Sequence, residues 1–136
     1  MDTLLVIGRV KALDGDPAER LEEEGLEILR TDDAEEGLRI CRAERPALAF
    51  VEVDAPEHDH FDLLTRLRET LEEDGRIVAV CNRYSEALDD YCEEMGANLA
   101  LPQSEQRANF GLFVRGLISL MPPKPARTPP EFEPVG

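Results

Sequence analysis

The side chains with the clearest potential for chemistry lie in one acidic segment. His58 and His60 are two positions apart, with Asp54, Glu57 and Asp59 beside them. Imidazole and carboxylate groups are common ligands of zinc and related metals. A metal site needs ligands that converge on one point, yet no second cluster in the sequence shows ligand spacing. We therefore expect solvated loop residues here and no metal site.

Thiols are the next candidates. The chain has three cysteines, Cys41, Cys81 and Cys92, with no CxxC pair and no nearby histidine at metal-site spacing. An odd number without such spacing indicates neither a disulfide framework nor a zinc site. We expect three buried free thiols that behave as small apolar side chains. The sequence thus contains no catalytic constellation, and we expect neither enzymatic activity nor a cofactor.

Length and charge limit the remaining possibilities. A chain of 136 residues with 42% hydrophobic residues can bury one core, so we expect one domain. The net charge of -15 repels phosphate backbones and anionic lipids, and no basic cluster overrides it. There is no apolar run of about 20 residues and no signal-peptide pattern. We expect a cytoplasmic protein that binds neither nucleic acid nor membrane.

The elements that would position functional residues are short apolar strands. Continuous apolar runs at Thr3 to Ile7, Ala47 to Val53 and Ile77 to Cys81 are typical of strands covered on both faces. The runs Leu26 to Leu29 and Leu99 to Leu101 are less purely apolar and suit the two edges of the same sheet. The sequence therefore predicts a parallel sheet of five strands.

Helical periods alternate with these strands. Apolar residues at helical spacing are Ala34, Leu38 and Cys41; Leu64, Leu67 and Leu71; Leu88, Tyr91, Cys92 and Met95; and Phe110, Val114, Leu117, Ile118 and Met121. Alternation of strand and helix implies right-handed crossovers with helices on both faces of the sheet. We predict a doubly wound α/β fold, a three-layer sandwich over residues 1–121. The proline-rich segment 122–136 reads as a disordered linker or tail.

The start of the first helix can be read locally. Asp16 followed by Pro17 is a capping arrangement with proline at the first helical position, which predicts a helix that begins near Pro17. Gly8 to Gly15 should then form a loop, with Leu13 as a candidate to plug any site beneath it. Asp32 and Asp33 precede a helical period and are explained as an N-cap.

The order of elements and several phrases resemble the receiver domains of response regulators, which have the chemotaxis-regulator fold. The resemblance covers about residues 4 to 120. It rests on these phrases: Leu4-Leu5-Val6-Ile7, Leu21-Glu22-Glu23-Glu24-Gly25, Thr31-Asp32-Asp33-Ala34-Glu35-Glu36-Gly37-Leu38, Arg45-Pro46-Ala47-Leu48, Phe61-Asp62-Leu63-Leu64 with Leu67-Arg68, and Met95-Gly96-Ala97-Asn98. The resemblance implies the strand order 2-1-3-4-5.

The same resemblance implies a phosphorylation site that this chain has lost. Receivers phosphorylate an aspartate at the end of the third strand, with Mg²⁺ on an acidic pair, a hydroxyl and a lysine nearby. Gly8 and Arg9 stand at the acidic pair, so the main Mg²⁺ ligands are missing. Glu52 stands at the phosphoacceptor and Cys81 at the hydroxyl, and a thiol is a weak donor. Gln103 stands at the lysine position, and a register shifted by one residue near Pro102 supplies no lysine either.

The aromatic switch position of the fifth strand falls on Ala100, which has no ring to reorient. The resemblance therefore indicates a degenerate receiver, a pseudo-receiver whose state is set by binding. Glu52 is either a permanent mimic of a phosphorylated aspartate or a residue under drift. We expect Arg9 or Arg83 to pair with it, because an unpaired half-buried carboxylate would be costly.

Three functions follow from this sequence. The first is a phosphorylation-independent signalling domain in a two-component-type pathway, which binds a protein partner or forms a homodimer. The alternative is an atypical phosphoacceptor that uses Glu52 or another carboxylate. A small-ligand or flavin-binding protein ranks lower, because the loop after the first strand lacks a phosphate-binding pattern. The candidate partner-binding residues form an acidic ridge on the fourth helix that would attract a basic partner: Glu86, Asp89, Asp90, Glu93 and Glu94.

Overall fold

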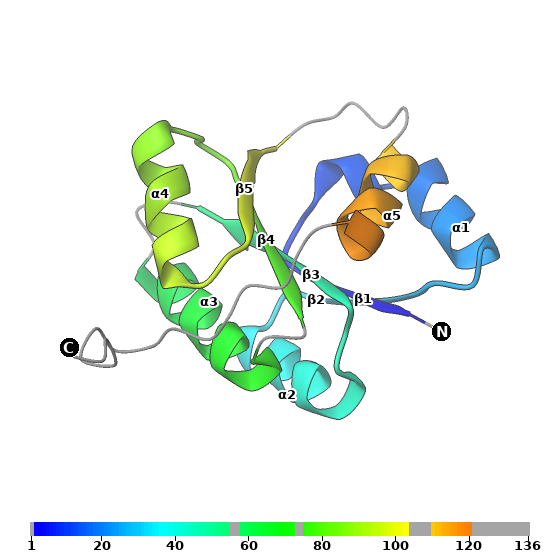
Figure 1. The fold of residues 1–136 in the computed structure, drawn as a ribbon, viewed down its shortest axis with the longest axis horizontal. Coiled ribbons are helices and arrows are strands. Elements are labelled where there is room, and N and C mark those ends of the chain that lie inside the picture. Colours follow the sequence, from blue (N-terminus) through cyan, green and yellow to red (C-terminus); the bar gives the residue numbers. More distant parts are fainter. Residues whose placement is uncertain (1, 55–57, 73–74, 104–109, 121–136) are drawn as a thin grey trace, which may run out of the picture.

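The strands and helices alternate along the described residues (Figure 1). The computed structural model describes residues 2–54, 58–72, 75–103 and 110–120. The strands are β1 (Thr3–Ile7), β2 (Glu27–Thr31), β3 (Leu48–Val53), β4 (Arg76–Cys81) and β5 (Leu99–Pro102). The helices are the short 3-10 turn η1 (Lys11–Leu13), α1 (Asp16–Glu23), α2 (Ala34–Glu44), α3 (His58–Leu71), α4 (Glu86–Met95) and α5 (Phe110–Leu120).

The five strands form one parallel sheet in the order β2-β1-β3-β4-β5, as predicted. The register places Ile7 beside Val51, and Val53 beside Cys81. The carboxyl ends of β1, β3 and β4 therefore meet at one edge of the sheet. This edge is where the topology of a doubly wound sheet usually places a binding site.

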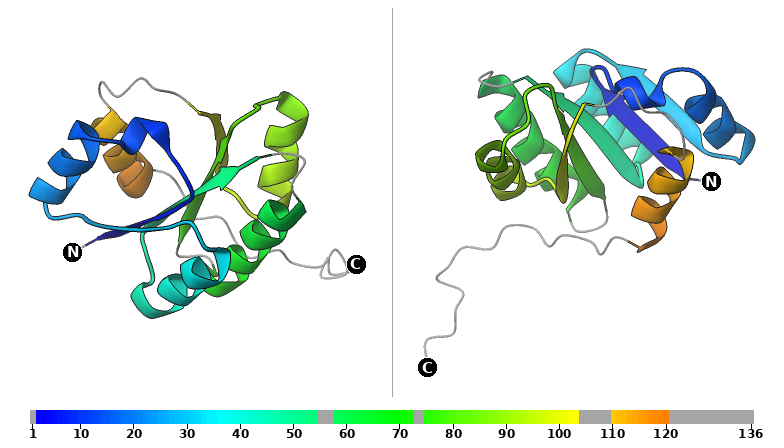
Figure 2. Two further views of the ribbon diagram at one scale, coloured as in Figure 1. Left: turned by 180° about the vertical axis from the view of Figure 1, so that it is seen from behind. Right: turned by 90° about the horizontal axis from the view of Figure 1, so that it is seen from above.

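Helices cover both faces of the sheet, as two views at right angles show (Figure 2). On one face, α2, α3 and α4 bury a cluster that includes Leu5, Val51 and Ile77. On the other face, α1, η1 and α5 bury a second cluster around Phe50, which includes Leu4. The near-continuous apolar runs of the central strands are needed because each strand must supply side chains to both clusters.

Capping residues explain where several helices begin. Asp33 caps α2, as predicted, and its carboxylate accepts a hydrogen bond from the amide of Glu36 at 3.1 Å. Ser85 caps α4 by accepting from the amide of Leu88 at 3.1 Å. The prediction for α1 was off by one position: Gly15 is the N-cap and Asp16 is the first helical residue. Proline nevertheless lies in the first turn, where its missing N–H costs nothing.

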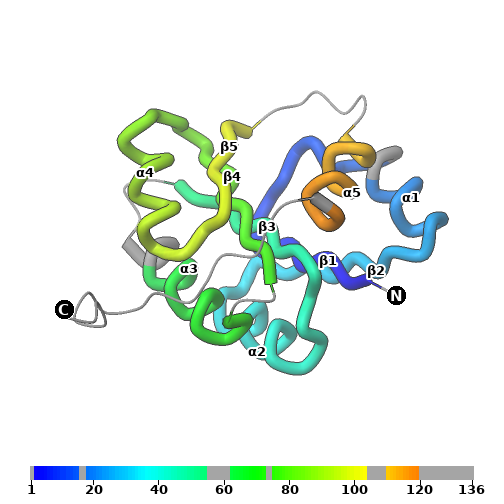
Figure 3. The backbone as a smooth tube through the Cα atoms, in the orientation of Figure 1, coloured from blue at the N-terminus to red at the C-terminus, as the bar shows by residue number. Residues whose placement is uncertain are grey.

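Two further predictions need correction. His58 and His60 do not lie in a loop, because they begin α3. Tyr91 does not join the core, because its side chain remains 44% exposed, whereas Leu88 and Cys92 on the same helix are buried. The proposed linker 122–136 lies outside the described residues. The trace in Figure 3 follows the remaining chain through its alternating elements.

A buried arginine holds one end of the sheet together. Arg68 on α3 is 4% exposed and donates to the carbonyl oxygens of Gly96, Glu72 and Gly75 at 3.0, 2.7 and 2.8 Å. It also donates to the side-chain oxygen of Asn98 at 2.6 Å. Burial lowers the pKa of Arg68 from its ordinary value. Polar oxygens, rather than a carboxylate, thus solvate this cation and join α3 to the segments that precede β4 and β5.

None of the helices in the described part of the chain is long and apolar enough to span a bilayer.

Candidate functional site at the carboxyl edge of the sheet

Glu52 is the centre of a hydrogen-bonded network at the carboxyl edge. Its side chain is half-buried near the end of β3. The backbone amide of Arg9, which follows β1, donates to Glu52 Oε1 at 2.9 Å. The side-chain amide of Asn82, which follows β4, donates to Glu52 Oε2 at 2.9 Å. Each carboxylate oxygen therefore accepts a bond from a different loop, and Glu52 joins the loops after β1 and β4.

The backbone of Gly8 packs directly against Glu52. Its φ of +90° lies in the region that favours glycine. A Cβ atom at this position would lie 2.6 Å from both Cβ and Oε1 of Glu52, far inside van der Waals contact. The position that holds an acidic residue in receivers therefore requires glycine here. The approach of the β1–α1 loop to β3 leaves no room for a side chain between them.

Gln103 fixes the same loop from the opposite side. Its side-chain nitrogen donates to the carbonyl oxygen of Arg9 at 2.6 Å, and its side-chain oxygen accepts from the amide of Lys11 at 3.2 Å. A neutral amide can do both because it carries a donor and an acceptor, whereas a lysine ammonium is donor-only. The residue at the family's lysine position thus binds backbone instead of supplying a cation.

The expected ion pair of Glu52 is not formed in the described structure. The guanidinium of Arg9 lies 3.8 Å from the carboxylate of Asp14. Neither Arg9 nor Arg83 makes an ion pair with Glu52 among the described residues. Arg9 does hold Glu52, but through its backbone amide. The pairing prediction was wrong because two neutral donors satisfy a half-buried carboxylate without the entropy cost of ordering an arginine side chain.

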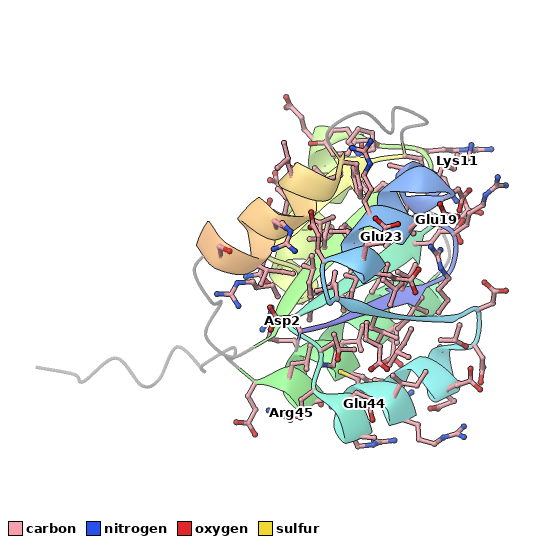
Figure 4. The ribbon with its side chains drawn as sticks, turned by 90° about the vertical axis from the view of Figure 1, so that its right-hand side faces the viewer. Asp2, Lys11, Glu19, Glu23, Glu44 and Arg45 are labelled. Carbon is pink, nitrogen blue, oxygen red and sulfur yellow. The ribbon has the colours of Figure 1, made fainter. Side chains whose placement is uncertain are left out.

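Leu13 also takes a different place from the one proposed. It is fully buried in the cluster beneath α1 and α5, and its carbonyl oxygen accepts from Arg30 at 3.1 Å. Gly8 and Arg9, rather than Leu13, are the loop residues that contact Glu52. Figure 4 shows this side of the molecule, with Lys11 on η1 and with Glu19 and Glu23 on α1.

Two further positions that the resemblance assigned to a phosphorylation site, Cys81 and Ala100, lie in the apolar core. Cys81 ends β4 in register with Val53 and is fully buried, and Ala100 is 3% exposed. All three cysteines are buried and free, as predicted. A hydrogen bond from Cys92 lowers the pKa of Cys81, whereas the same contact raises the pKa of Cys92. Burial raises the pKa of Cys41 to about 11.

A receiver's metal ion would find few ligands here. Gly8 and the backbone of Arg9 supply no carboxylate where the acidic pair would stand, and both oxygens of Glu52 accept hydrogen bonds. The described residues also contain no group of three His, Cys, Asp or Glu side chains arranged to hold a metal ion. The residues present do not fit Mg²⁺, which requires oxygen ligands in near-octahedral geometry.

The five residues of the predicted acidic ridge on α4 differ in how far they are exposed to solvent. Glu86, Asp90 and Glu94 are exposed, as expected, whereas Asp89 and Glu93 are half-buried. The hydroxyl of Tyr84 donates to Asp89 Oδ2. This contact raises the pKa of Tyr84 to about 12, because Asp89 favours the protonated phenol. The side-chain contacts of Asp89 with Glu93 and Tyr84 lower its pKa.

We define the α4 outer stripe as the residues that share the solvent-facing side of this helix: Glu86, Ala87, Asp90, Tyr91 and Glu94. All five are exposed. Glu86, Asp90 and Glu94 are four positions apart, as are Ala87 and Tyr91, and this spacing places them along one side of an α-helix.

Asn82 is the functional residue that sequence reasoning missed. It comes directly after the buried strand β4, and its amide reaches Glu52 across the sheet edge. Its position was the available signal: a polar residue directly follows a buried strand, and the neighbouring strand β3 carries the polar Glu52 one residue before its end.

Comparisons with known proteins agree with this architecture. A response regulator from Thermotoga maritima superposes with a TM-score of 0.72 and 20% identity, over 88% of this chain and 98% of that one. A CheY-like receiver domain protein from Methanospirillum hungatei JF-1 gives 0.70 and 19%, over 87% and 94%. A response regulator from Burkholderia pseudomallei, solved with a phosphorylated aspartic acid, a calcium ion and citrate, gives 0.61 and 22%, over 88% and 74%.

No protein-family description and no curated protein sequence matches the chain. The structural likeness, at these identities, concerns the fold. The strand order β2-β1-β3-β4-β5, with helices on both faces, matches the CheY-like doubly wound fold. This chain has the fold of response-regulator receiver domains.

Proposed function

We propose that this chain is a phosphorylation-independent receiver-like signalling domain that acts through protein–protein contacts. One observation carries the proposal: both oxygens of Glu52 are held by donors from flanking loops, Arg9 N–H and the Asn82 amide. Phosphoryl transfer to Glu52 would replace one of these bonds with a bulky anion. The site offers no acidic pair for a metal and no lysine at the end of β5 to balance that charge.

Glu52 has a structural role in this proposal. Because it joins the loop after β1 to the loop that leads into α4, it holds both in one arrangement without any covalent change. In receivers, the phosphoryl group is what biases the corresponding loops. The glutamate side chain is one methylene longer than aspartate, so its carboxylate would place a permanent negative charge farther from the strand. This favours the interpretation of Glu52 as a mimic of a phosphorylated aspartate over neutral drift.

Intact-mass spectrometry after treatment with acetyl phosphate and Mg²⁺ tests the absence of phosphoryl transfer. We expect no species heavier by one phosphoryl group. NMR spectra recorded with beryllofluoride and Mg²⁺ should also show no shifts clustered around Glu52. The matched variants are Glu52→Gln and Asp54→Asn. Stoichiometric labelling that is lost in Glu52→Gln but retained in Asp54→Asn would establish the alternative, an atypical phosphoacceptor; the reverse pattern would assign it to Asp54.

The α4 outer stripe is the partner-binding surface that we propose. Asp90 and Glu94 make no ion pair with a described residue, so their charge is available to a basic partner. Such a surface would speed association and make it sensitive to salt. The helix that carries it, α4, packs beside β5, the edge strand of the sheet (Figure 1). A protein partner with a basic surface, rather than a homodimer of this acidic chain, is favoured by charge.

Affinity for a partner recovered by pull-down should be compared between the wild type and Asp90→Lys/Glu94→Lys over a salt series. We expect weaker binding and a shallower salt dependence for this variant. Glu19→Lys/Glu23→Lys on α1 is the matched control, because it makes the same change of charge at exposed positions of another helix. Equal effects of both variants would mean that only net charge matters, and no effect of either would place the interface elsewhere.

A further inference from the structure

Two of the three cysteines meet inside the protein. Cys81 is the last residue of β4, and Cys92 lies on the buried side of α4. Side chains alternate along β4, so Ala79 and Cys81 enter the cluster beneath α2, α3 and α4, whereas Val80 enters the other cluster. Cys92 belongs to the same cluster as Cys81, and both are fully buried. The pair therefore joins a strand to the helix that covers it.

The two thiols are close enough to share a hydrogen bond. This contact lowers the pKa of Cys81 and raises the pKa of Cys92, so the thiol of Cys92 donates and the sulfur of Cys81 accepts. Burial and the carboxylate of Asp89 act against the first shift, yet the pKa of Cys81 stays below its ordinary value. The thiol with the lower pKa is more often ionised, and the thiolate is the nucleophile. Cys81 is therefore the thiol that reacts first with an oxidant.

Cys41 shows what the pairing adds. It lies on α2 and is equally buried, and burial raises its pKa to about 11. Arg45 and Arg42 oppose this shift, and no second thiol is among the groups that act on Cys41. A buried thiol with a raised pKa reacts slowly with oxidants, because little of it is thiolate. Cys41 is thus an internal reference with the same burial and no thiol beside it.

A small oxidant has a short route to Cys81. The four residues that follow it, Asn82 to Ser85, are all exposed, and α4 begins only at Glu86. The helix packs beside β5, the edge strand of the sheet (Figure 1). Loops and peripheral elements open locally at a lower cost than the whole fold. Access to the pair therefore requires only a local opening of this loop and the start of α4.

We propose that Cys81 and Cys92 form an oxidisable dithiol, which a peroxide converts into a disulfide that ties α4 to the end of β4. The thiolate of Cys81 attacks one oxygen of hydrogen peroxide, the O–O bond breaks, hydroxide leaves, and Cys81 becomes a sulfenic acid. The sulfur of Cys92 then attacks the sulfur of Cys81, the S–O bond breaks, and a second hydroxide leaves. The two thiol protons convert both hydroxides to water. The two sulfurs lose two electrons in total, which the peroxide takes up.

The disulfide would act on the candidate functional site through the chain. Cys81 immediately precedes Asn82, whose amide donates to Glu52, and Cys92 lies on the helix that carries the α4 outer stripe. A covalent bond between sulfurs is shorter than a hydrogen-bonded contact, so α4 must shift toward β4 when it forms. The inference goes beyond the proposed function, because it holds whether or not Glu52 accepts a phosphoryl group.

A count of free thiols tests the proposal. The reduced protein is treated with excess hydrogen peroxide, freed of it, unfolded in urea and alkylated with iodoacetamide. We expect the number of alkylated cysteines to fall from three to one, with the remaining label on Cys41. A non-reducing digest should contain one peptide pair linked through Cys81 and Cys92, and dithiothreitol should restore all three thiols.

Three outcomes of this experiment would overturn the proposal. The first is that all three cysteines are still alkylated after oxidation. The second is a disulfide that includes Cys41 or links two chains. The third is a sulfinic acid on Cys81 or Cys92 in place of the disulfide.

Variants test the order of the two steps. Cys92→Ala leaves no second thiol, so the sulfenic acid of Cys81 should persist and react with dimedone, a reagent that traps sulfenic acids. Cys81→Ala should give no adduct on Cys92. Cys41→Ala is the matched control and should form the disulfide like the wild type. A dimedone adduct on Cys92 in Cys81→Ala, with none on Cys81 in Cys92→Ala, would reverse the assigned roles. The peptide map of the wild type tests the disulfide without any variant.

Amide NMR spectra of the reduced and oxidised protein test the tie between α4 and β4. We expect shifts in the loop that follows Cys81 and along α4, and none in α2. Shifts confined to Cys81 and Cys92 would contradict a movement of the helix. None of these measurements uses a phosphoryl donor, so phosphoryl labelling of Glu52 would refute the proposed function without changing the thiol count. Three free thiols after oxidation would leave the phosphorylation result as it is.

Discussion

Replacing Gly8 with alanine tests whether the β1–α1 loop is built against Glu52. The change has two costs that can be separated. A non-glycine residue at a φ of +90° has a conformational cost of about 1 to 2 kcal/mol. The new Cβ would also lie 2.6 Å from Glu52 Cβ, which is part of the strand and cannot swing away. Overpacking of this kind costs about 1 to 3 kcal/mol.

We therefore expect Gly8→Ala to lower the free energy of unfolding by about 2 to 5 kcal/mol, a large share of the total stability of a small domain. Urea unfolding followed by circular dichroism measures this quantity. Gly25→Ala is the matched control. Gly25 has a φ of +98°, but a Cβ added there would meet no atom within 4 Å, so this variant should show the conformational cost alone.

A double-mutant cycle with Glu52→Gly isolates the steric cost. In that background the opposing Cβ and carboxylate are gone, so Gly8→Ala should cost about as much as Gly25→Ala, leaving a coupling energy of about 1 to 3 kcal/mol. If Gly8→Ala costs the same in both backgrounds, the close packing of this loop on Glu52 is refuted. The result also bears on function, because aspartate at position 8 would meet the same obstacle.

Two other predictions concern groups away from Glu52. Arg68→Met should lower the free energy of unfolding by about 3 to 5 kcal/mol, because it strands buried oxygens that now solvate the guanidinium; Arg66→Met, whose side chain is exposed, should cost less than about 1 kcal/mol in the same urea titration. Tyr84 has a folded pKa of about 12 against an ordinary value of 10.0. Its contact with Asp89 therefore stabilises the fold below pH 10, and that contribution is lost as the pH rises toward 12. Urea titrations across this range should show a steeper loss of stability for the wild type than for Tyr84→Phe, and an unchanged slope would refute the contact.

The strands were predictable because burial on both faces leaves an unmistakable apolar run. β1 has the predicted bounds, and the other strands differ by one or two residues at their ends. The helices were predictable from periodicity, but Tyr91 was misplaced. It lies three positions after the buried Leu88, yet α4 packs beside the edge strand β5, where the buried stripe of a helix is narrower than in the middle of a sheet.

The composition of the site was predictable, but its hydrogen bonds were not. Counting along the strands placed Glu52 beside the loop after β1, and the structure agrees. Sequence reasoning gave Glu52 a charged partner, whereas the structure gives it a backbone amide and Asn82. Every residue except proline carries the same backbone N–H donor, so the residue type does not indicate which amide will bind Glu52. The partner depends on the path of the loop, which tertiary packing determines.

The two hydrogen bonds of Gln103 to the backbone of Arg9 and Lys11 also have a consequence for the order of folding. They join residues 92 and 94 positions apart, so they can form only after a long stretch of chain has been closed. The loop after β1 should therefore acquire its final shape late, once the last strand has joined the sheet. Loss of these two hydrogen bonds would then accelerate unfolding while leaving the refolding rate nearly unchanged, as for contacts absent from the transition state.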